Sequence, residues 1–318
     1  MVDDLGHGVH LVDTGFHRPQ FDAAYLIVDE GRAAFVDTGT RHALPRLLEA
    51  LAVCGLGVDA VDWVIPTHVH LDHAGGAGPL MQALPNARLL VHPRGARHMI
   101  DPSALYLGAL AVYGQEEMDR SYGQLVGVDA ARVQTSHDGM KAKLGKRELE
   151  LIDTPGHALH HHCVWDPCSR GWFTGDTFGL SYRELDVDGR PWILPTSTPV
   201  QFQPEALRRS IERLLARQPD AVYLTHFGKL GNVQQLGEML LNLLDQLVAL
   251  GHSLRDKSPQ RARHEALCSG LRSIFHASLR EHGCTLADEA IDDVLALDIE
   301  LNAQGMAVWL DRDKRDHR

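Results

Sequence analysis

The chain has 318 residues, of which 44% are hydrophobic, and its 31 basic and 42 acidic residues give a formal net charge of -11. This acidity argues against nucleic acid as a partner, because nucleic acids are bound largely by basic side chains that release counterions. The sequence has no apolar run long enough to span a bilayer, and its first residues lack a basic segment followed by an apolar one. We therefore expect a cytoplasmic protein with no membrane partner.

Strands and helices alternate in the first part of the chain. Each expected strand is short, apolar and bounded by glycine or aspartate. These strands span residues 9–15, 23–29, 32–39, 61–68 and 87–93. Helices are expected at 41–55, where Thr40 is a candidate N-cap, and at 74–84. This alternation is typical of layered α/β proteins.

Residues 93–127 interrupt the alternation with helical periodicity. We predict a helical insertion there, and long excursions between core strands often form a lid or a pocket wall. The expected strands then resume at 131–136, 146–156, 161–166, 170–178 and 220–228. A helix at 204–218 has proline at its first position.

The chain beyond residue 230 shows only helical patterns. Apolar residues recur every three or four positions in 231–251, 259–282 and 285–304. The charged residues 311–318 are expected to fray. We therefore predict two domains, a larger α/β domain over 1–229 and a helical extension over 230–318.

The stretch PTHVHLDHAGG at 66–76 contains three histidines and an aspartate within six positions. In an extended strand, residues two apart point the same way, so His68 and His70 can bind one ion. Asp72 and His73 follow as the chain turns toward a helix, and they can bind a neighbouring ion. Imidazole and carboxylate ligands suit Zn, Fe and Mn.

Three more candidate ligands follow apolar strands far along the chain. His157 comes after a Pro-Gly turn, Asp176 after TG, and His226 after a buried strand. Loops just beyond strand ends are common positions for functional residues because the rigid sheet fixes them. The sequence therefore predicts a metal site built from distant segments.

Five short motifs occur along the chain: VDTG at 36–39, THVHLDHAGG at 67–76, TPGH at 154–157, TGDT at 174–177 and THFG at 225–228. In content and order they resemble the motifs of the metallo-β-lactamase superfamily, and the resemblance covers residues 8–230. It implies a four-layer αβ/βα sandwich with metals at one edge.

The resemblance also implies a ligand set for two divalent metal ions, zinc foremost, with iron or manganese as alternatives. The first ion would be held by His68, His70 and His157, the second by Asp72, His73 and His226, and Asp176 would bridge both. Asp37 would not bind an ion itself but would orient the side chains that do. Two ions lower the pKa of a shared water, so we expect hydrolysis by a metal-bridging hydroxide, with Asp72, His157 and Asp176 as catalytic residues.

The substrate is less well defined. Tyr182 and Arg183, directly after TGDT, are candidates to contact a carbonyl or anionic group, although a solvated loop is the alternative. His161 is a further candidate, or else an ordinary strand residue. Tyrosines in the insertion either line a pocket or pack it. We expect a small-molecule substrate.

The helical C-terminal region resembles glyoxalase II-like and lactonase-like branches of the superfamily. The expected activity is therefore hydrolysis of a small ester, thioester or lactone. A phosphodiesterase or phosphoesterase of the same fold is an alternative, as is a non-hydrolytic di-iron module for redox chemistry or ligand binding. The C-terminal helices are also a candidate homodimer contact.

Overall fold

The computed structural model describes residues 2–197 and 201–316. Within them the packing separates two compact units. Unit 1 comprises Met1–Asp153, His160–Gly175 and Pro219–Gly231, and unit 2 comprises Thr154–Leu159, Asp176–Gln218 and Asn232–Arg318. The division into domains 1–229 and 230–318 stays a prediction.

The first sheet of unit 1 follows the chain order from β1 to β7. Its strands are β1 Val2–Asp4, β2 Val9–Asp13, β3 Ala23–Asp29, β4 Arg32–Val36, β5 Val61–Ile65, β6 Arg88–Val91 and β7 Val133–Thr135. The first four strands are antiparallel neighbours, whereas β4 to β7 run parallel. Parallel strands end at the same edge, so the segments that follow β4 and β5 emerge side by side.

The second sheet of unit 1 has the order β13-β12-β11-β10-β9-β8. Its strands are β8 Met140–Leu144, β9 Arg147–Asp153, β10 His162–Asp166, β11 Gly171–Gly175, β12 Ala221–Leu224 and β13 Gly228–Leu230. Only β11 and β12 pair in parallel. The sequence pattern missed β8, because its alternate lysines leave few apolar residues in the segment MKAKL.

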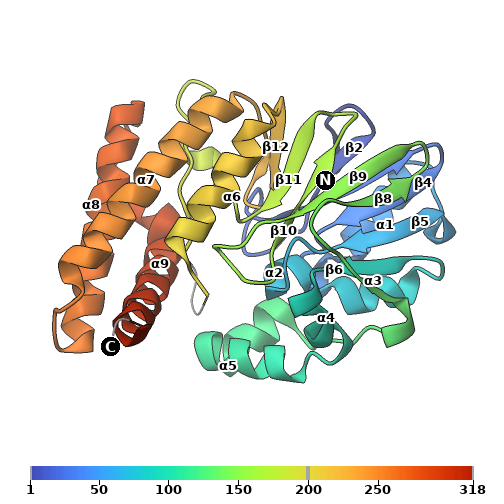
Figure 1. Cartoon of the computed structure of the whole chain (residues 1–318). Coiled ribbons are helices and arrows are strands. Elements are labelled where there is room, and N and C mark those ends of the chain that lie inside the picture. The colour runs from blue at the N-terminus through green and yellow to red at the C-terminus, as the bar shows by residue number, and fades with distance from the viewer. Residues whose placement is uncertain (1, 198–200, 317–318) are drawn as a thin grey trace. The chain divides into compact units, whose positions relative to one another are not determined.

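Helices of unit 1 cover one face of the first sheet (Figure 1). They are α1 Leu44–Val53, α2 Leu71–Ala74, α3 Ala77–Ala83 and α4 Pro93–Ile100, while α5 Ser103–Glu117 packs against α4. The last two confirm a helical insertion. The helix expected at 74–84 is confirmed as α3, which begins after the glycine pair, and the short α2 ends at Ala74 just before that pair. A Cβ at Gly76 would lie 2.8 Å from two carbonyl oxygens of the 38–40 turn, so only glycine fits this close approach. Thr40 precedes a short 3-10 turn but makes no side-chain cap hydrogen bond.

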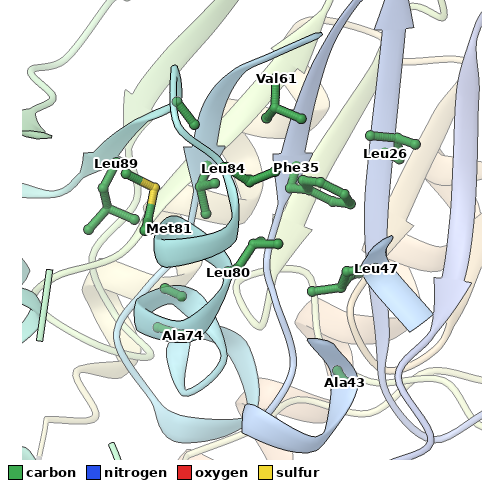
Figure 2. Packing of buried hydrophobic residues seen from close by; sticks show 14 of the residues in the cluster. Leu26, Phe35, Ala43, Leu47, Val61, Ala74, Leu80, Met81, Leu84 and Leu89 are labelled. Carbon is green, nitrogen blue, oxygen red and sulfur yellow. The ribbon is translucent and has the colours of Figure 1, made fainter. Parts of the chain in front are cut away.

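Two apolar layers hold unit 1 together. Leu26, Phe35 and Leu80 are fully buried between the first sheet and its helices (Figure 2). Tyr25 and Phe173 belong to the other layer, between the two sheets, with their ring centroids 5.1 Å apart. Burying each such side chain contributes roughly 1.5–3 kcal/mol. The unit is therefore an α/β sandwich, as predicted.

Unit 2 contains the remaining long helices, α6 Pro204–Ala216, α7 Val233–Leu254, α8 Gln260–His282 and α9 Asp288–Asp316. Helix α8 packs against both α7 and α9 (Figure 1). The expectation of a frayed tail from residue 311 is wrong as far as Asp316, where α9 ends, and residues 317–318 lie outside the described residues. Across the part of the chain that the structure describes, none of the helices has both the length and the apolarity needed to cross a bilayer.

Candidate metal centre

Asp37 links three strand ends of unit 1. It follows β4, and its Oδ1 accepts a hydrogen bond of 2.7 Å from the backbone N–H of Thr67, which follows β5. Its Oδ2 accepts from the Thr225 hydroxyl, also at 2.7 Å, after β12. Asp37 has a φ of +56°, a conformation that aspartate tolerates better than most residues. The carboxylate thus ties the edges of both sheets together.

The imidazoles of His73 and His226 are fixed from behind. Asp37 Oδ2 lies 2.8 Å from His73 Nδ1, and the carbonyl oxygen of Phe21 lies 2.8 Å from His226 Nδ1. Because a carboxylate and a carbonyl only accept, both Nδ1 atoms carry the proton. In the neutral form, each ring presents the lone pair of Nε2 on its other side.

Asp72 stands in front of these two lone pairs. Its Oδ2 lies 3.4 Å from His226 Nε2 and 3.8 Å from His73 Nε2. Three potential ligand atoms therefore lie within 4.8 Å of one another. This arrangement suits a cation at their centre.

His68 and His70 form the adjoining part of the cluster. His68 Nε2 lies 2.8 Å from His70 Nδ1, and the His68 ring centroid lies 4.0 Å from that of His73. His68 and His73 are completely buried. Unit 1 thus brings together five of the seven predicted ligands.

The other two predicted ligands, His157 and Asp176, lie together in unit 2. His157 Nε2 is 3.4 Å from Asp176 Oδ2. The loop before His157 is held against α6, because Ser210 donates a hydrogen bond of 2.7 Å to the carbonyl of Pro155. Gly156 has a φ of +138°, and a Cβ there would lie 2.3 Å from the backbone of Leu207. This position therefore requires glycine.

The run of histidines at 160–162 lies beside the cluster in unit 1. The buried His161 ring lies nearly parallel to His68, with centroids 4.8 Å apart. His160 accepts a hydrogen bond of 3.4 Å from the backbone N–H of Val69. Burial lowers the pKa of both His160 and His162 to about 3, so these rings are neutral. The predicted contact of His161 with substrate stays a prediction.

Tyr182 and Arg183 have partners within unit 2. The Tyr182 hydroxyl donates a hydrogen bond of 3.0 Å to Asp298. Arg183 donates to the Ser181 carbonyl at 2.9 Å and lies 3.4 Å from Asp186. These contacts explain why both side chains are ordered, and their role toward substrate stays a prediction.

Asp22 is a buried acid that the sequence pattern did not single out. It is fully buried, and its Oδ2 accepts a hydrogen bond of 2.6 Å from Thr14. Burial raises the pKa of its carboxyl to about 7, while the nearby His226 acts in the opposite direction. The acid stands at the first residue before β3, where its sequence context resembles an ordinary strand boundary.

A pocket of about 440 Å³ opens in unit 1 near these groups. Its wall includes Phe16 and His17, which contact Phe21, and the Phe21 ring centroid lies 5.4 Å from that of His226. The residues that line it are Thr14, Gly15, Phe16, His17, Thr40, His42, Arg120 and Ser121. No motif marks them in the sequence, because three separate segments of the chain supply them.

Comparison with known proteins places these motifs in one family. Residues 17–226 match the family model of the metallo-beta-lactamase superfamily. A curated relative, the metallo-beta-lactamase fold-containing protein ST1585 of Sulfurisphaera tokodaii, is 26% identical over 235 residues, which are 70% of this chain and 78% of the relative.

Solved structures share the fold at lower identity. The family member TTHA1429 from Thermus thermophilus has a TM-score of 0.67 and 20% identity, covering 98% of this chain and 95% of its own. A structure described as a peroxy diiron species of the chemotaxis sensor ODP has a TM-score of 0.54 and 17% identity, covering 76% of this chain and 94% of its own. The predicted fold class is thereby confirmed.

Proposed function

Because the chain belongs to the metallo-beta-lactamase superfamily, we propose that it is a dinuclear metal-dependent hydrolase of a small ester, thioester or lactone. The observation that carries the proposal is the convergence of Asp72 Oδ2 with the Nε2 atoms of His73 and His226. Separations of 3.4 and 3.8 Å are close to those between ligands of one zinc ion, for which bond lengths near 2.0–2.2 Å imply about 3.3–3.6 Å.

His157 and Asp176 complete the ligand set in this proposal. Asp176 directly follows Gly175, the last residue of β11, so the edge of the sheet fixes the backbone position of Asp176. The loop of His157 leaves β9 at Asp153 and returns to β10 at His162, and these two residues pair with each other. An extended chain spans at most about 3.6 Å per residue, so His157 stays within about 14 Å of Asp153.

Two bound metal ions would supply a deprotonated water near neutral pH and polarise the substrate carbonyl. The protein residues have separate tasks. Asp37 and the Phe21 carbonyl hold the two imidazoles in one tautomer, so their Nε2 atoms stay unprotonated. The Asp72 side chain is partly exposed, so its carboxylate can accept a proton during the reaction. The buried His68 and His161 exclude bulk water from the inner side.

The pocket beside the cluster supports a small-molecule substrate. Its volume of about 440 Å³ lies within the roughly 300–1,000 Å³ of typical ligand pockets. His17, His42 and Arg120 line it and offer N–H donors to a carbonyl or carboxylate oxygen. The Arg120 guanidinium also forms an ion pair with Glu117, which restricts its position.

A substrate panel tests the proposal. The zinc-loaded chain is assayed with a chromogenic ester, a thioester, a lactone, a phosphodiester and a β-lactam, alongside Asp72→Ala. Asp220→Ala is the matched control, because it removes an exposed carboxylate that pairs with the exposed Arg170. We expect turnover of an ester, thioester or lactone that Asp72→Ala abolishes and Asp220→Ala preserves.

Other outcomes contradict the proposal. Turnover restricted to the phosphodiester would favour the phosphodiesterase alternative. A coloured protein with two iron ions per chain, which reacts with oxygen and hydrolyses none of the compounds, would favour the redox alternative. Hydrolysis that survives in Asp72→Ala would remove this carboxylate from the mechanism.

A further inference from the structure

A second group of metal-binding side chains lies in unit 2, on the neighbouring helices α8 and α9. We propose that His264, Cys268 and Glu300 bind one thiophilic divalent cation of the zinc class. This site is independent of the strand-end cluster, by which we mean His68, His70, Asp72, His73 and His226. His264 Nε2 lies 3.1 Å from Glu300 Oε2 and 3.5 Å from Cys268 Sγ. Cys268 Sγ lies 3.8 Å from Glu300 Oε2, which closes a small triangle of one nitrogen, one sulfur and one oxygen.

The size of this triangle matches a tetrahedral zinc site. Zinc binds sulfur at about 2.3 Å, imidazole nitrogen at about 2.0–2.1 Å and carboxylate oxygen at about 2.0–2.2 Å. Tetrahedral angles then place these ligands about 3.3–3.7 Å apart. The three observed separations of 3.1, 3.5 and 3.8 Å bracket that range. An ion therefore needs only small side-chain adjustments to bind.

The helices themselves create the arrangement. His264 and Cys268 are four residues apart on α8, so they lie on the same face of the helix. Glu300 comes from α9, which packs against α8. Gln304, one turn further along α9, donates a hydrogen bond of 2.7 Å to Glu300 Oε1. This contact leaves Oε2 facing the histidine and the cysteine, as an outer group does for a metal ligand.

The surroundings leave room for a positive ion. Arg272, one turn after Cys268, is occupied by an ion pair of 2.9 Å with Asp292. The His264 and Glu300 side chains are 33% and 48% exposed, so water can fill the fourth position of a tetrahedral ion. Burial and the adjacent Glu300 raise the pKa of the Cys268 thiol, and a bound cation would reverse this by displacing the proton.

Bound metal would link α8 to α9. Any ligand that binds the folded chain but not the unfolded chain raises stability by mass action. The ion would therefore cross-link two helices of unit 2. This role does not depend on hydrolysis by the strand-end cluster.

Cobalt(II) provides a selective probe. The full chain is freed of metal with a chelator and titrated with Co²⁺ while its near-ultraviolet absorbance is recorded. A thiolate bound to cobalt gives a charge-transfer band, and the predicted strand-end ligands are only imidazoles and carboxylates. We expect a band whose amplitude corresponds to one cobalt–thiolate centre per chain and that disappears in Cys268→Ser.

Matched variants separate binding from misfolding. Cys168→Ser removes another exposed cysteine and should retain the band. Glu300→Gln keeps the side-chain shape but lacks the anionic oxygen, so it should retain the fold by circular dichroism and bind cobalt at least about tenfold more weakly. Zinc should raise the Tm of the wild-type chain more than that of His264→Ala.

Three results would overturn the proposal. The band could be absent from the wild-type chain at saturating cobalt, or it could persist in Cys268→Ser. Equal cobalt affinity in wild type and Glu300→Gln would likewise show that the three side chains form a hydrogen-bonded cluster only. Failure of the hydrolase assay would leave each of these spectroscopic results unchanged.

Discussion

The strand-end cluster and the cluster on α8 and α9 both combine imidazole and carboxylate groups, and the second adds a thiol. Their surroundings differ. His68 and His73 are completely buried, whereas His264 is 33% exposed. At the strand ends, Asp37 accepts hydrogen bonds from the Thr67 backbone and the Thr225 hydroxyl and fixes His73 in turn. On the helices, a single amide from Gln304 orients one ligand.

This difference separates a preorganised site from an adaptable one. Ligands that cannot move away from one another hold an ion in one geometry. Stabilisation of a transition state requires such a fixed geometry. Side chains on exposed helix faces keep more rotamer freedom, so they bind an ion with less geometric control. The contrast predicts that removing an outer residue harms the strand-end cluster far more than the helical one.

The largest effect should follow Asp37→Ala. The change leaves the Thr67 N–H and the Thr225 hydroxyl without their acceptor, and each such buried group costs about 1–3 kcal/mol. Loss of an outer residue typically weakens metal binding about 10–100-fold. Competition with a chelator measures the affinity, and chemical unfolding measures the stability.

Gln304→Ala is the corresponding change on the helices. It should weaken cobalt binding at Cys268 by only a few-fold, because Gln304 is partly exposed and water can replace its amide. If both variants lost metal affinity equally, the distinction between the two clusters would be wrong.

Gly156→Ala should have the next largest effect. Its Cβ would lie 2.3 Å from the Leu207 backbone, so the loop before His157 must move, at a cost of about 1–3 kcal/mol. Activity should fall with stability, while the cobalt–thiolate band stays. Gly283→Ala is the control: its φ is also positive, at +99°, but the nearest atom lies 3.5 Å away. An equal loss of activity in the control would contradict the steric argument.

A further effect concerns acid stability. Burial lowers the pKa of His162 to about 3 in the folded chain, against 6.5 in the unfolded chain. Below pH 6.5 the unfolded chain therefore binds more protons, and stability falls as the pH drops toward 3, by up to about 1.4 kcal/mol per pH unit. His162→Asn should flatten this dependence.

Unfolding in denaturant between about pH 7 and pH 4 measures the slope. His7→Asn is the control, because it removes an exposed histidine at a positive φ that asparagine tolerates. A His162→Asn slope identical to that of wild type would show that this ring does not contribute to acid sensitivity.

Local sequence determined most elements because apolar periodicity and turn residues act over short distances. The strands that precede Asp37, His68 and His226 were predicted because each is short and rich in apolar residues. Helices α6 to α8 were predicted within a few residues for the same reason. Strand β8 and helix α2 were missed, because alternate lysines leave few apolar residues in β8 and α2 has only four residues.

The ligand prediction came from the motifs alone, since their residue types and order match those of the superfamily. Only the tertiary structure revealed that Asp37 joins three strand ends, that Phe21 fixes His226, and that loops around Phe16 and Arg120 enclose a pocket. The triangle of His264, Cys268 and Glu300 could not be predicted from the sequence either, because no motif links residues on separate helices. Such contacts depend on which faces of distant segments pack together, and a linear pattern contains no information about that register.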